Sequence, residues 1–247
     1  MNFKGKKVVI TGGSIGIGLE LAKKLLKEGA HVLVCARNLP ALEAAKKRHP
    51  ALCIAQCDVT DQQQVEQLLE TALVQLGGVD ILINNAAVFR LFNILEDYPV
   101  EKQVQEIDIN FKGTVQVTNI FLKELLKSPS PIIVNLTSAL GFIPMTSAGI
   151  YSATKAAINS WTISLRHQLR DTKAKVVLLC PPVVDTRMNE NNPGTAKMKK
   201  ISPEKFAELT LRGLRKNRSE IFVGNISAFK MISRWMPRFA FRVINKN

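Results

Sequence analysis

The chain has 247 residues, of which 46% are hydrophobic and 22% are charged, a balance typical of a globular protein with one large core. The formal net charge is +14, but thirteen Lys or Arg residues against three acids fall between Lys197 and Asn247, so +10 of this charge is confined to the last fifth. This distribution excludes a nucleic-acid-binding surface that covers the whole protein, and the lack of eighteen consecutive apolar residues excludes a membrane-spanning helix.

The N-terminus and the cysteines indicate a reducing compartment. Residues 1–7 lead directly into an apolar run and lack the hydrophobic stretch of a signal peptide, so we expect a cytoplasmic protein. Cys53 and Cys57 have no second Cys or His pair to complete a zinc site, so we expect no metal ion. The four cysteines lie in or beside apolar runs, as buried free thiols do: Cys35, Cys53, Cys57 and Cys180.

A strand, a glycine-rich turn and a helix open the chain. Residues 7–10 are a short apolar run, and apolar residues at helical spacing predict a helix over 19–28. Between them, Gly12, Gly16 and Gly18 permit a tight turn and a close approach of the backbone to a ligand. Their spacing differs from the common dinucleotide fingerprint, but a strand before and a helix after are the context that such a turn requires. We therefore expect a nucleotide diphosphate at the N-terminus of this helix.

The second predicted strand, residues 30–36, is followed directly by Arg37, which stands nineteen residues after Gly18. In nucleotide-binding α/β folds this distance places the group that contacts the adenosine ribose. An acid there accepts a hydrogen bond from the 2′-hydroxyl of NAD, whereas a guanidinium suits the 2′-phosphate of NADP. We therefore expect a preference for NADP(H), with a solvated surface arginine as the alternative interpretation.

Strands and helices alternate along the rest of the chain. The pattern predicts strands over 51–57, 79–83, 132–137, 174–180 and 220–223, and helices over 62–76 (with Asp61 as N-cap), 100–126 and 151–170. This order predicts an α/β fold, a single doubly wound Rossmann-type domain with a seven-stranded parallel sheet flanked by helices. The ligand site of such a sheet lies outside the carboxyl ends of its strands. The residues expected to converge there are the glycine turn, Arg37, Asp58, Asn84, Ser138 and Pro181.

Tyr151 and Lys155 stand four residues apart in a predicted helix, so they lie on one face of it. A lysine ammonium one turn away favours the phenolate, which lowers the tyrosine pKa from its ordinary value near ~10. Ser138, at the exit of the preceding strand, could hold a carbonyl oxygen against the tyrosine. The spacing also occurs by chance in many helices, and Asn110, in an apolar setting, has the alternative interpretation of a satisfied core amide.

The order and spacing of these motifs resemble the short-chain dehydrogenase/reductase family over about residues 5–225. The Pro181-Pro182 pair, Thr186 and the basic C-terminus are similar to the DltE-type branch of this family. Ala87 and Pro182 depart from the family pattern, which has glycine at both positions. The matching motifs are Thr11-Gly12-x3-Gly16-x-Gly18, Asp58-Val59, Asn84-Asn85-Ala86, Asn110, Ser138, Tyr151-x3-Lys155 and, loosely, Pro181-x4-Thr186.

The resemblance implies hydride transfer between a nicotinamide and a carbonyl or alcohol. Tyr151 would donate and accept the proton, Lys155 would favour the tyrosinate and bind the nicotinamide ribose, and Ser138 would orient the substrate oxygen. Asn110 would hold a water that connects Lys155 to solvent. The implied cofactor-binding residues are Gly12, Ser14, Ile15, Gly16, Ile17, Arg37, Asp58, Val59, Asn85, Ala86, Tyr151, Lys155, Pro181, Val184 and Thr186.

The resemblance implies that residues 183–202 cover the substrate. This segment lacks periodicity, so we expect a mobile loop there. It contains Asn189, Asn191, Asn192, Pro193 and Gly194. Apolar residues after the strand ends suggest a hydrophobic carbonyl or alcohol substrate, although core packing explains them equally well. They are Phe89, Leu91, Phe92, Leu140, Phe142, Met145, Val183 and Met188.

We expect residues 1–225 to form the Rossmann-type unit and residues 226–247 a basic, apolar helical extension of the same domain, bent at Pro237. The extension either covers the substrate cleft or a subunit interface, which we favour, or lies on an anionic membrane surface. Family habit implies a homodimer or homotetramer, formed through the helices that begin near residues 100 and 151. The alternative function is an NADP(H)-binding sensor or scaffold without turnover, and no nucleic-acid partner is expected.

Overall fold

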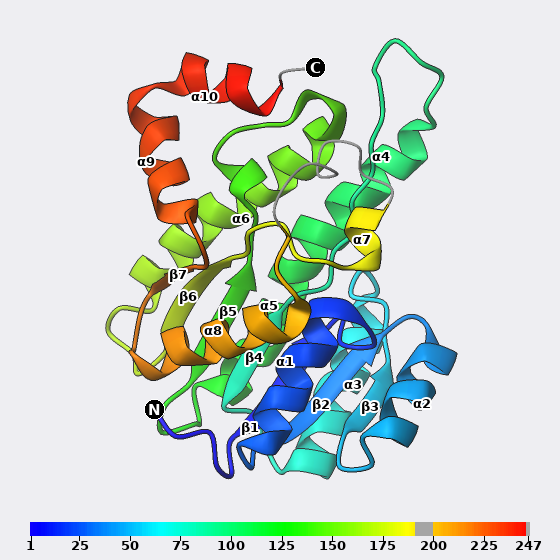
Figure 1. The fold of residues 1–247 in the computed structure, drawn as a ribbon. Helices are drawn as coiled ribbons and strands as arrows, with labels where there is room; N and C mark the ends of the chain where they lie inside the picture. The colour runs from blue at the N-terminus through cyan, green and yellow to red at the C-terminus, as the bar shows by residue number, and fades with distance from the viewer. Residues whose placement is uncertain (191–199, 246–247) are drawn as a thin grey trace.

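A central sheet organises the molecule in the computed structural model, which describes residues 1–190 and 200–245, without the side chains of residues 189 and 190 (Figure 1). Within these residues seven strands, all parallel, form one sheet in the order β3-β2-β1-β4-β5-β6-β7. The predicted doubly wound, seven-stranded fold is therefore confirmed. The strands are β1 (Lys7–Thr11), β2 (His31–Ala36), β3 (Cys53–Gln56), β4 (Ile81–Asn84), β5 (Ile132–Leu136), β6 (Lys175–Cys180) and β7 (Glu220–Phe222).

Two layers of helices bury the two faces of this sheet (Figure 1). Every residue of β4 and β5 is buried, as expected for parallel strands covered on both sides. On one face lie α1 (Gly16–Lys27), α2 (Leu39–Arg48) and α8 (Pro203–Arg215), and on the other α3 (Gln62–Leu76), α5 (Gly113–Leu125) and α6 (Gly149–Gln168). The chain order reverses between β1 and β4, so their carboxyl ends open a crevice there.

Three helices lie where the sequence patterns predicted none. These are α2, α8 and the short α7 (Arg187–Glu190), which falls inside the segment expected to be a loop. Val184 and Ile201, near the two ends of that segment, pair in an isolated parallel bridge. Asn191, Asn192, Pro193 and Gly194, which were part of the same expectation, lie outside the described residues.

The prediction of a single continuous helix over 100–126 is wrong in one respect. It consists of α4 (Val100–Ile107), a π-helical turn η1 (Asp108–Lys112) and α5. A π turn inserts an extra residue into the helix and often lies at functional sites. Here it carries the buried Asn110, whose side chain bonds to the backbone of Val88 instead of facing solvent.

The expected ends of α3 are confirmed. The side chain of Asp61 accepts a hydrogen bond from the backbone N–H of Gln64 at 3.1 Å, which satisfies one of the free donors of the first turn. Gly77 ends the helix with φ of 73°, in the left-handed region that glycine adopts without strain.

The C-terminal segment forms two helices, α9 (Ile226–Trp235) and α10 (Pro237–Ile244), which meet at an angle (Figure 1). The bend expected at Pro237 is present, because Met236 leaves the helical region with φ of −132° and ψ of 59° and Pro237 begins the next helix. Among the described helices, none has the length and apolar character needed to cross a bilayer.

Candidate active site

A cleft of about 1360 Å³ opens at the carboxyl ends of the strands. It is lined by the segments that follow β1, β2, β3, β4, β5 and β6, and by residues of α9 and α10. All fifteen residues predicted to hold a cofactor line it, and so does Ser138. Asn110 does not line it, but lies behind its wall in η1. The structure therefore brings these lining residues together from the segments after six strands and from α6 (Gly149–Gln168). Asn84, expected at the same place, is instead buried, and its side chain donates to Thr118 and Asn135.

The glycine-rich turn presents its backbone to this cleft. Gly12 has φ of +66°, and a Cβ on it would lie 2.8 Å from the Cα of Ala86. The side-chain amide of Asn85 donates to the carbonyls of Thr11 and Gly12, both at 2.9 Å, and so fixes the turn against the end of β4. Ile15, the N-cap of α1, provides no side-chain cap, and the first turn of α1 carries no acid. Its N–H groups are thus free to bind an anion.

We expect Gly18→Ala to weaken both the fold and cofactor binding. A Cβ at residue 18 would lie 2.5 Å from the carbonyl oxygen of Gly12, so the turn must shift, which costs about 1–3 kcal/mol of unfolding free energy. Gly149→Ala is the matched control, because a Cβ at the start of α6 meets no atom within 4 Å. Urea unfolding and nucleotide titration of both variants measure the difference, and equal behaviour would contradict the packing argument.

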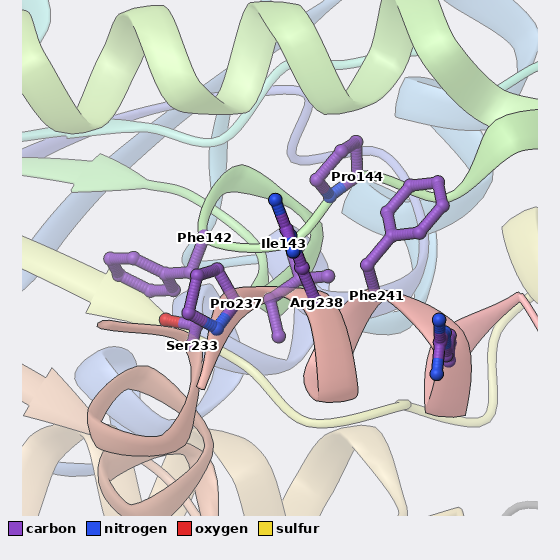
Figure 2. A pocket seen from close by; sticks show the side chains of 8 residues that line it. Phe142, Ile143, Pro144, Ser233, Pro237, Arg238 and Phe241 are labelled. Atoms are coloured by element: carbon purple, nitrogen blue, oxygen red, sulfur yellow. The ribbon is translucent and has the colours of Figure 1, made fainter. Parts of the chain in front are cut away.

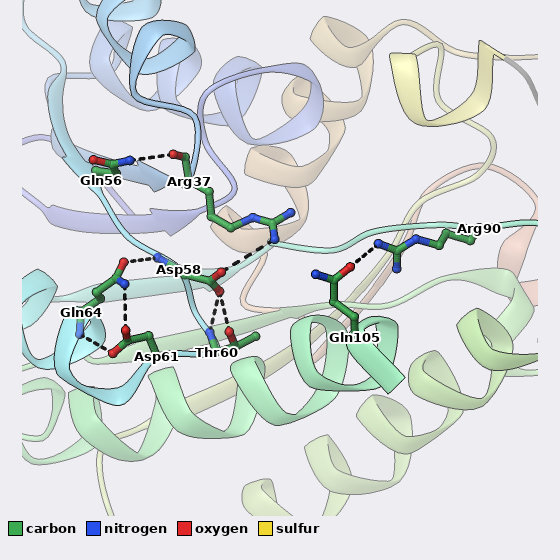
Figure 3. Close-up of polar contacts among 8 residues, drawn as sticks. All are labelled: Arg37, Gln56, Asp58, Thr60, Asp61, Gln64, Arg90 and Gln105. Carbon is green, nitrogen blue, oxygen red and sulfur yellow. Dashed lines mark hydrogen bonds and ion pairs between the residues drawn. The ribbon is translucent and has the colours of Figure 1, made fainter. Parts of the chain in front are cut away.

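Arg37 lines the cleft, and Figure 3 shows its guanidinium directed toward Asp58. Its Nη1 lies 3.7 Å from Oδ2 of Asp58, in an ion pair that solvent reaches, so the pair holds the guanidinium only weakly. Asp58 is held more firmly, because its Oδ1 accepts hydrogen bonds from the backbone and hydroxyl of Thr60 at 2.9 and 2.8 Å. Arg37 can therefore turn toward an added anion while Asp58 stays in place.

Sequence reasoning missed two polar residues at this end of the cleft, Asn38 and Arg48. Asn38 caps α2 by accepting a hydrogen bond from Ala41 N, and Arg48 is the last residue of that helix. The cap residue before Pro40 and the basic run at residues 46–48 were signals for this helix. A second guanidinium thus lines the same cleft as Arg37.

Tyr151 and Lys155 lie on one face of α6, as predicted, and both line the cleft. Lys155 is only 2% exposed, its Nζ donates to the carbonyl of Leu136 at 3.1 Å, and Nζ lies 5.4 Å from the centroid of the Tyr151 ring. Ser138 follows β5 and caps the short helix η2 (Ala139–Gly141) by accepting a hydrogen bond from Leu140 N. The three side chains therefore meet at the exit of β5.

Burial shifts the pKa values of both titratable groups toward their neutral forms. The pKa of Tyr151 is raised above its ordinary value, because burial disfavours the phenolate more than hydrogen bonding with Ser138 favours it. The prediction that Lys155 lowers the pKa of Tyr151 below its ordinary value is therefore wrong for the protein alone. Burial also lowers the pKa of Lys155 to about 8. Near neutral pH the site holds a neutral phenol beside an ammonium that loses its proton readily.

Asn110 is fully engaged inside the protein. Its Oδ1 accepts from Val88 N at 2.8 Å, and its Nδ2 donates to Val88 O at 2.9 Å and to the hydroxyl of Thr154 at 3.2 Å. Thr154 directly precedes Lys155 on α6. The side chain therefore ties the segment after β4 to the helix that carries Tyr151 and Lys155.

A buried acid, Glu106, was also missed from the sequence. It lies on α4, one turn before Asn110, and accepts a hydrogen bond from Arg90 N at 3.3 Å. Burial raises its pKa to about 7, against the opposing influence of Arg90 and Lys155. Polar residues stand close to Glu106 in the sequence, Gln105 before it and Asp108 after it, so no sequence pattern indicated a buried acid here. Together the side chains of Glu106 and Asn110 hold residues 88–90, and Phe89 between them packs edge-on against Tyr151 at 4.9 Å.

We expect Glu106→Gln to stabilise the fold at high pH only. The pKa of Glu106 is about 7 in the folded protein and 4.5 ordinarily. Ionisation of Glu106 therefore lowers the unfolding free energy progressively as pH rises from about 4.5 to 7, and this loss is complete above pH 7. The full pKa shift corresponds to about 3 kcal/mol, and solvent screening reduces the expected gain in unfolding free energy at pH 8 relative to pH 4.5 to about 2 kcal/mol. Urea unfolding across this range tests it, with the exposed Glu101→Gln on the same helix as control; a gain independent of pH would contradict it.

The other end of the cleft is mostly apolar. Of the eight residues predicted there, Leu91, Phe92 and Phe142 do not line it: Leu91 packs beside Tyr151, and Phe92 stacks on Tyr98 with ring centroids 5.4 Å apart. The sequence did not identify three residues of the C-terminal helices, Ile226, Phe229 and Ile244, that complete this end. The five predicted residues that do line it are Phe89, Leu140, Met145, Val183 and Met188.

A second, smaller hollow of about 380 Å³ lies between α10 and the segment after η2 (Figure 2). Figure 2 shows the Arg238 side chain between Phe142 and Phe241, which form opposite walls. Among the described residues no group of three or more His, Cys, Asp or Glu side chains is placed to hold a metal ion.

Comparison with known proteins identifies the family. A family profile described as short chain dehydrogenase matches residues 6–197. The chain belongs to the short-chain dehydrogenase/reductase family. It is 39% identical over 226 residues to the uncharacterized oxidoreductase DltE of Bacillus subtilis (strain 168), covering 90% of this chain and 89% of that protein. It is 36% identical over 212 residues to an uncharacterized oxidoreductase of Staphylococcus epidermidis, covering 85% of this chain and 91% of the relative.

Solved short-chain dehydrogenases share the fold. A short chain dehydrogenase from Burkholderia cenocepacia J2315, solved in complex with NADP, matches with a TM-score of 0.86 and 25% identity over 100% of both chains. A short chain dehydrogenase/reductase from Burkholderia phymatum, in complex with NAD, matches with a TM-score of 0.85 and 24% identity, covering 97% of this chain and 96% of the other. The chain is thus an oxidoreductase of the dehydrogenase/reductase type, and the predicted DltE-type branch is confirmed.

Proposed function

We propose that this protein interconverts a carbonyl and an alcohol on an apolar small molecule with NADP(H), and that Tyr151 is its general acid and base. The observation that carries the proposal is the meeting of Tyr151, Lys155 and Ser138 in one cleft with an uncapped glycine-rich turn. The alternative, a cofactor sensor without turnover, has no need for a buried lysine beside a buried tyrosine.

The residues present fit a dinucleotide. The glycine turn leaves no room for side chains, and the free N–H groups of α1 suit a diphosphate. Arg37 and Arg48, which both line the cleft, provide guanidinium groups suited to a 2′-phosphate, which supports NADP(H) over NAD(H). The two Burkholderia structures, one in complex with NADP and one with NAD, favour neither nucleotide, so the preference rests on the arginines. When bound, the nicotinamide supplies or accepts the hydride.

The protein's own residues handle the proton. In reduction, the neutral phenol of Tyr151 gives its proton to the substrate oxygen, and in oxidation the phenolate takes it back. The raised pKa keeps Tyr151 protonated at neutral pH, while the nearby Lys155 ammonium stabilises the negative charge that forms on its oxygen. Ser138 holds the substrate oxygen from the other side. Asn110 positions α6 through Thr154 and so keeps Lys155 in line with the tyrosine.

The lining of the cleft supports an apolar substrate. Phe89, Leu140 and Met145 surround Tyr151, and Ile226 and Phe229 of α9 close the same end. Burial of apolar substrate surface against these side chains supplies about 25 cal/mol per Å² of binding free energy.

A panel of carbonyl and alcohol compounds, graded from polar to apolar, tests the proposal. Nicotinamide absorbance is followed with NADPH for the carbonyls and NADP+ for the alcohols. We expect kcat/KM to rise with the apolar area of the substrate. Tight NADPH binding without turnover of any compound would support the sensor alternative, and a preference for charged substrates would contradict the proposed substrate class.

We also propose a homo-oligomer formed through α4 and α6, as the family commonly does. Exposed apolar side chains on these helices support this arrangement: Val100, Val104 and Ile107 on α4, and Ile163 on α6. Sedimentation of the wild type and of Val104→Asp would distinguish a dimer or tetramer from a monomer.

A further inference from the structure

The two C-terminal helices expose an apolar stripe that no described part of the chain covers. Trp235 is 80% exposed, and Met231 lies one turn before it on α9. Phe239 and Val243 follow on successive turns of α10, and both are about half exposed. A spacing of four places side chains one above the other along a helix, so α9 and α10 each carry one exposed apolar pair, and the bend at Pro237 separates the two parts of the stripe. We call residues 226–245 the C-terminal elbow.

Three arginines are interleaved in the sequence with the exposed apolar residues of this stripe. Arg234, Arg238 and Arg242 each directly precede an exposed apolar residue, and no described residue forms an ion pair with them. The elbow contains no Asp or Glu, and its fourth cation, Lys230, is already paired with Glu220 at 2.8 Å. Two copies of such a surface would repel each other. Aromatic and aliphatic side chains interleaved with unpaired arginines instead suit a surface of apolar chains and phosphate groups.

A second exposed apolar element stands at the same end of the molecule. Ile94 and Leu95, at the tip of the segment between β4 and α4, are 78% and 90% exposed. Figure 1 shows this segment and α10 projecting from the same end. Both are hydrogen-bonded to one short stretch, because Phe92 N donates to Ser147 O at 2.9 Å and Thr146 N donates to Asn245 Oδ1 at 2.7 Å. The base of the tip segment and the C-terminal end of the elbow are therefore bound to adjacent residues.

The cleft opens next to this surface. Ile244, on the last turn of α10, lines the cleft and packs in the cluster that contains Met145 and Tyr151. The hollow with Arg238 and Phe241 in its wall lies beneath the same helix (Figure 2). A partner on the elbow would thus face the apolar end of the cleft.

We propose that the C-terminal elbow and the Ile94–Leu95 tip dock this protein on the surface of an anionic lipid bilayer. The apolar side chains enter the interface, and the three arginines bind lipid phosphates. Each basic residue near an anionic surface contributes about 1 kcal/mol, so three arginines supply the electrostatic part and the exposed apolar side chains the rest. If the proposed function also holds, an apolar substrate dissolved in the bilayer reaches the cleft from this side.

Vesicle cosedimentation with the full-length protein tests the proposal. We expect the protein to pellet with vesicles of phosphatidylglycerol and phosphatidylcholine, much less with phosphatidylcholine alone, and less again as salt is raised. A variant with Gln at residues 234, 238 and 242 should bind about 100-fold more weakly, and Trp235→Ser with Phe239→Ser should also reduce binding. None of these five residues lines the cleft, so nucleotide affinity should not change.

Matched controls separate docking from general charge and hydrophobicity. Lys46→Gln, Lys47→Gln and Lys173→Gln remove the same charge from exposed positions elsewhere, and Val74→Ser removes an 85% exposed apolar side chain from α3. These variants should bind as the wild type does, and thermal unfolding checks that every variant is folded. Tyr151→Phe should pellet normally, so a failure of catalysis is distinguishable from a failure of docking.

Three results would overturn the proposal. The first is no binding to the anionic vesicles at low salt, and the second is equal binding by the wild type and the triple Gln variant. The third is concentration-dependent self-association, without vesicle binding, that Trp235→Ser and Phe239→Ser abolish, since a second copy of the chain would then be the partner.

Discussion

Replacing Tyr151 by Phe is expected to lower turnover by about 100- to 10,000-fold, because a positioned general acid contributes a rate factor of this size. The affinity for NADPH should stay within about twofold, because the aromatic ring is retained. The phenol of Tyr151 lines the cleft beside Ser138 and carries its proton at neutral pH, because burial raises its pKa. The phenylalanine ring still packs edge-on against Phe89. Steady-state nicotinamide absorbance and NADPH fluorescence titration measure the two quantities.

The chain supplies its own control for this variant. Its only other tyrosine, Tyr98, stacks on Phe92 and does not line the cleft. Tyr98→Phe should therefore keep full activity. Full activity of Tyr151→Phe would refute the assignment of the general acid, whereas loss of NADPH affinity together with activity would indicate a structural role.

Arg37→Ala is expected to weaken NADPH binding by about 10- to 100-fold and to leave NADH binding nearly unchanged. A charge-assisted hydrogen bond is worth about 1.5–3 kcal/mol, and each 1.4 kcal/mol is a factor of ten in affinity. The solvent-exposed pair with Asp58 leaves the guanidinium available for the 2′-phosphate (Figure 3). Fluorescence titration with both nucleotides gives the ratio directly.

Arg170→Ala serves as the comparison, because Arg170 is exposed, pairs with Asp171 at 3.4 Å and lies outside the cleft. It should change neither affinity. Arg48→Ala should have a smaller effect of the same sign if the second guanidinium shares the phosphate. Similar wild-type affinities for NADH and NADPH, unaffected by Arg37→Ala, would show that Arg37 is only a surface arginine.

The sheet could be predicted because buried parallel strands appear in the sequence as continuous apolar runs. Residues 81–83 and 132–134 are such runs, and each is followed by polar residues that the topology brings to one edge. Asp61 and Gly77 delimited α3 through a side-chain cap and a left-handed residue, both of which are local properties of the sequence. The nucleotide end of the site followed from these same local signals.

The rest depended on contacts between distant segments. Nothing local in residues 100–126 predicts a π turn, because the turn is stabilised by bonds from Asn110 to Val88. The raised pKa of Tyr151 could not be predicted either, since burial comes from Phe89 and from the C-terminal helices. Ile226, Phe229 and Ile244 reach the cleft only because α9 and α10 fold back over it.

The most direct test of hydride transfer uses NADPH that carries deuterium at both C4 positions of the nicotinamide. The wild type is incubated with the best carbonyl compound of the panel, and the alcohol is analysed by mass spectrometry. We expect one deuterium at the carbinol carbon, formed by the wild type and by Tyr98→Phe but only in traces by Tyr151→Phe. NADPH that binds tightly while no compound of the panel acquires deuterium would contradict an enzymatic role.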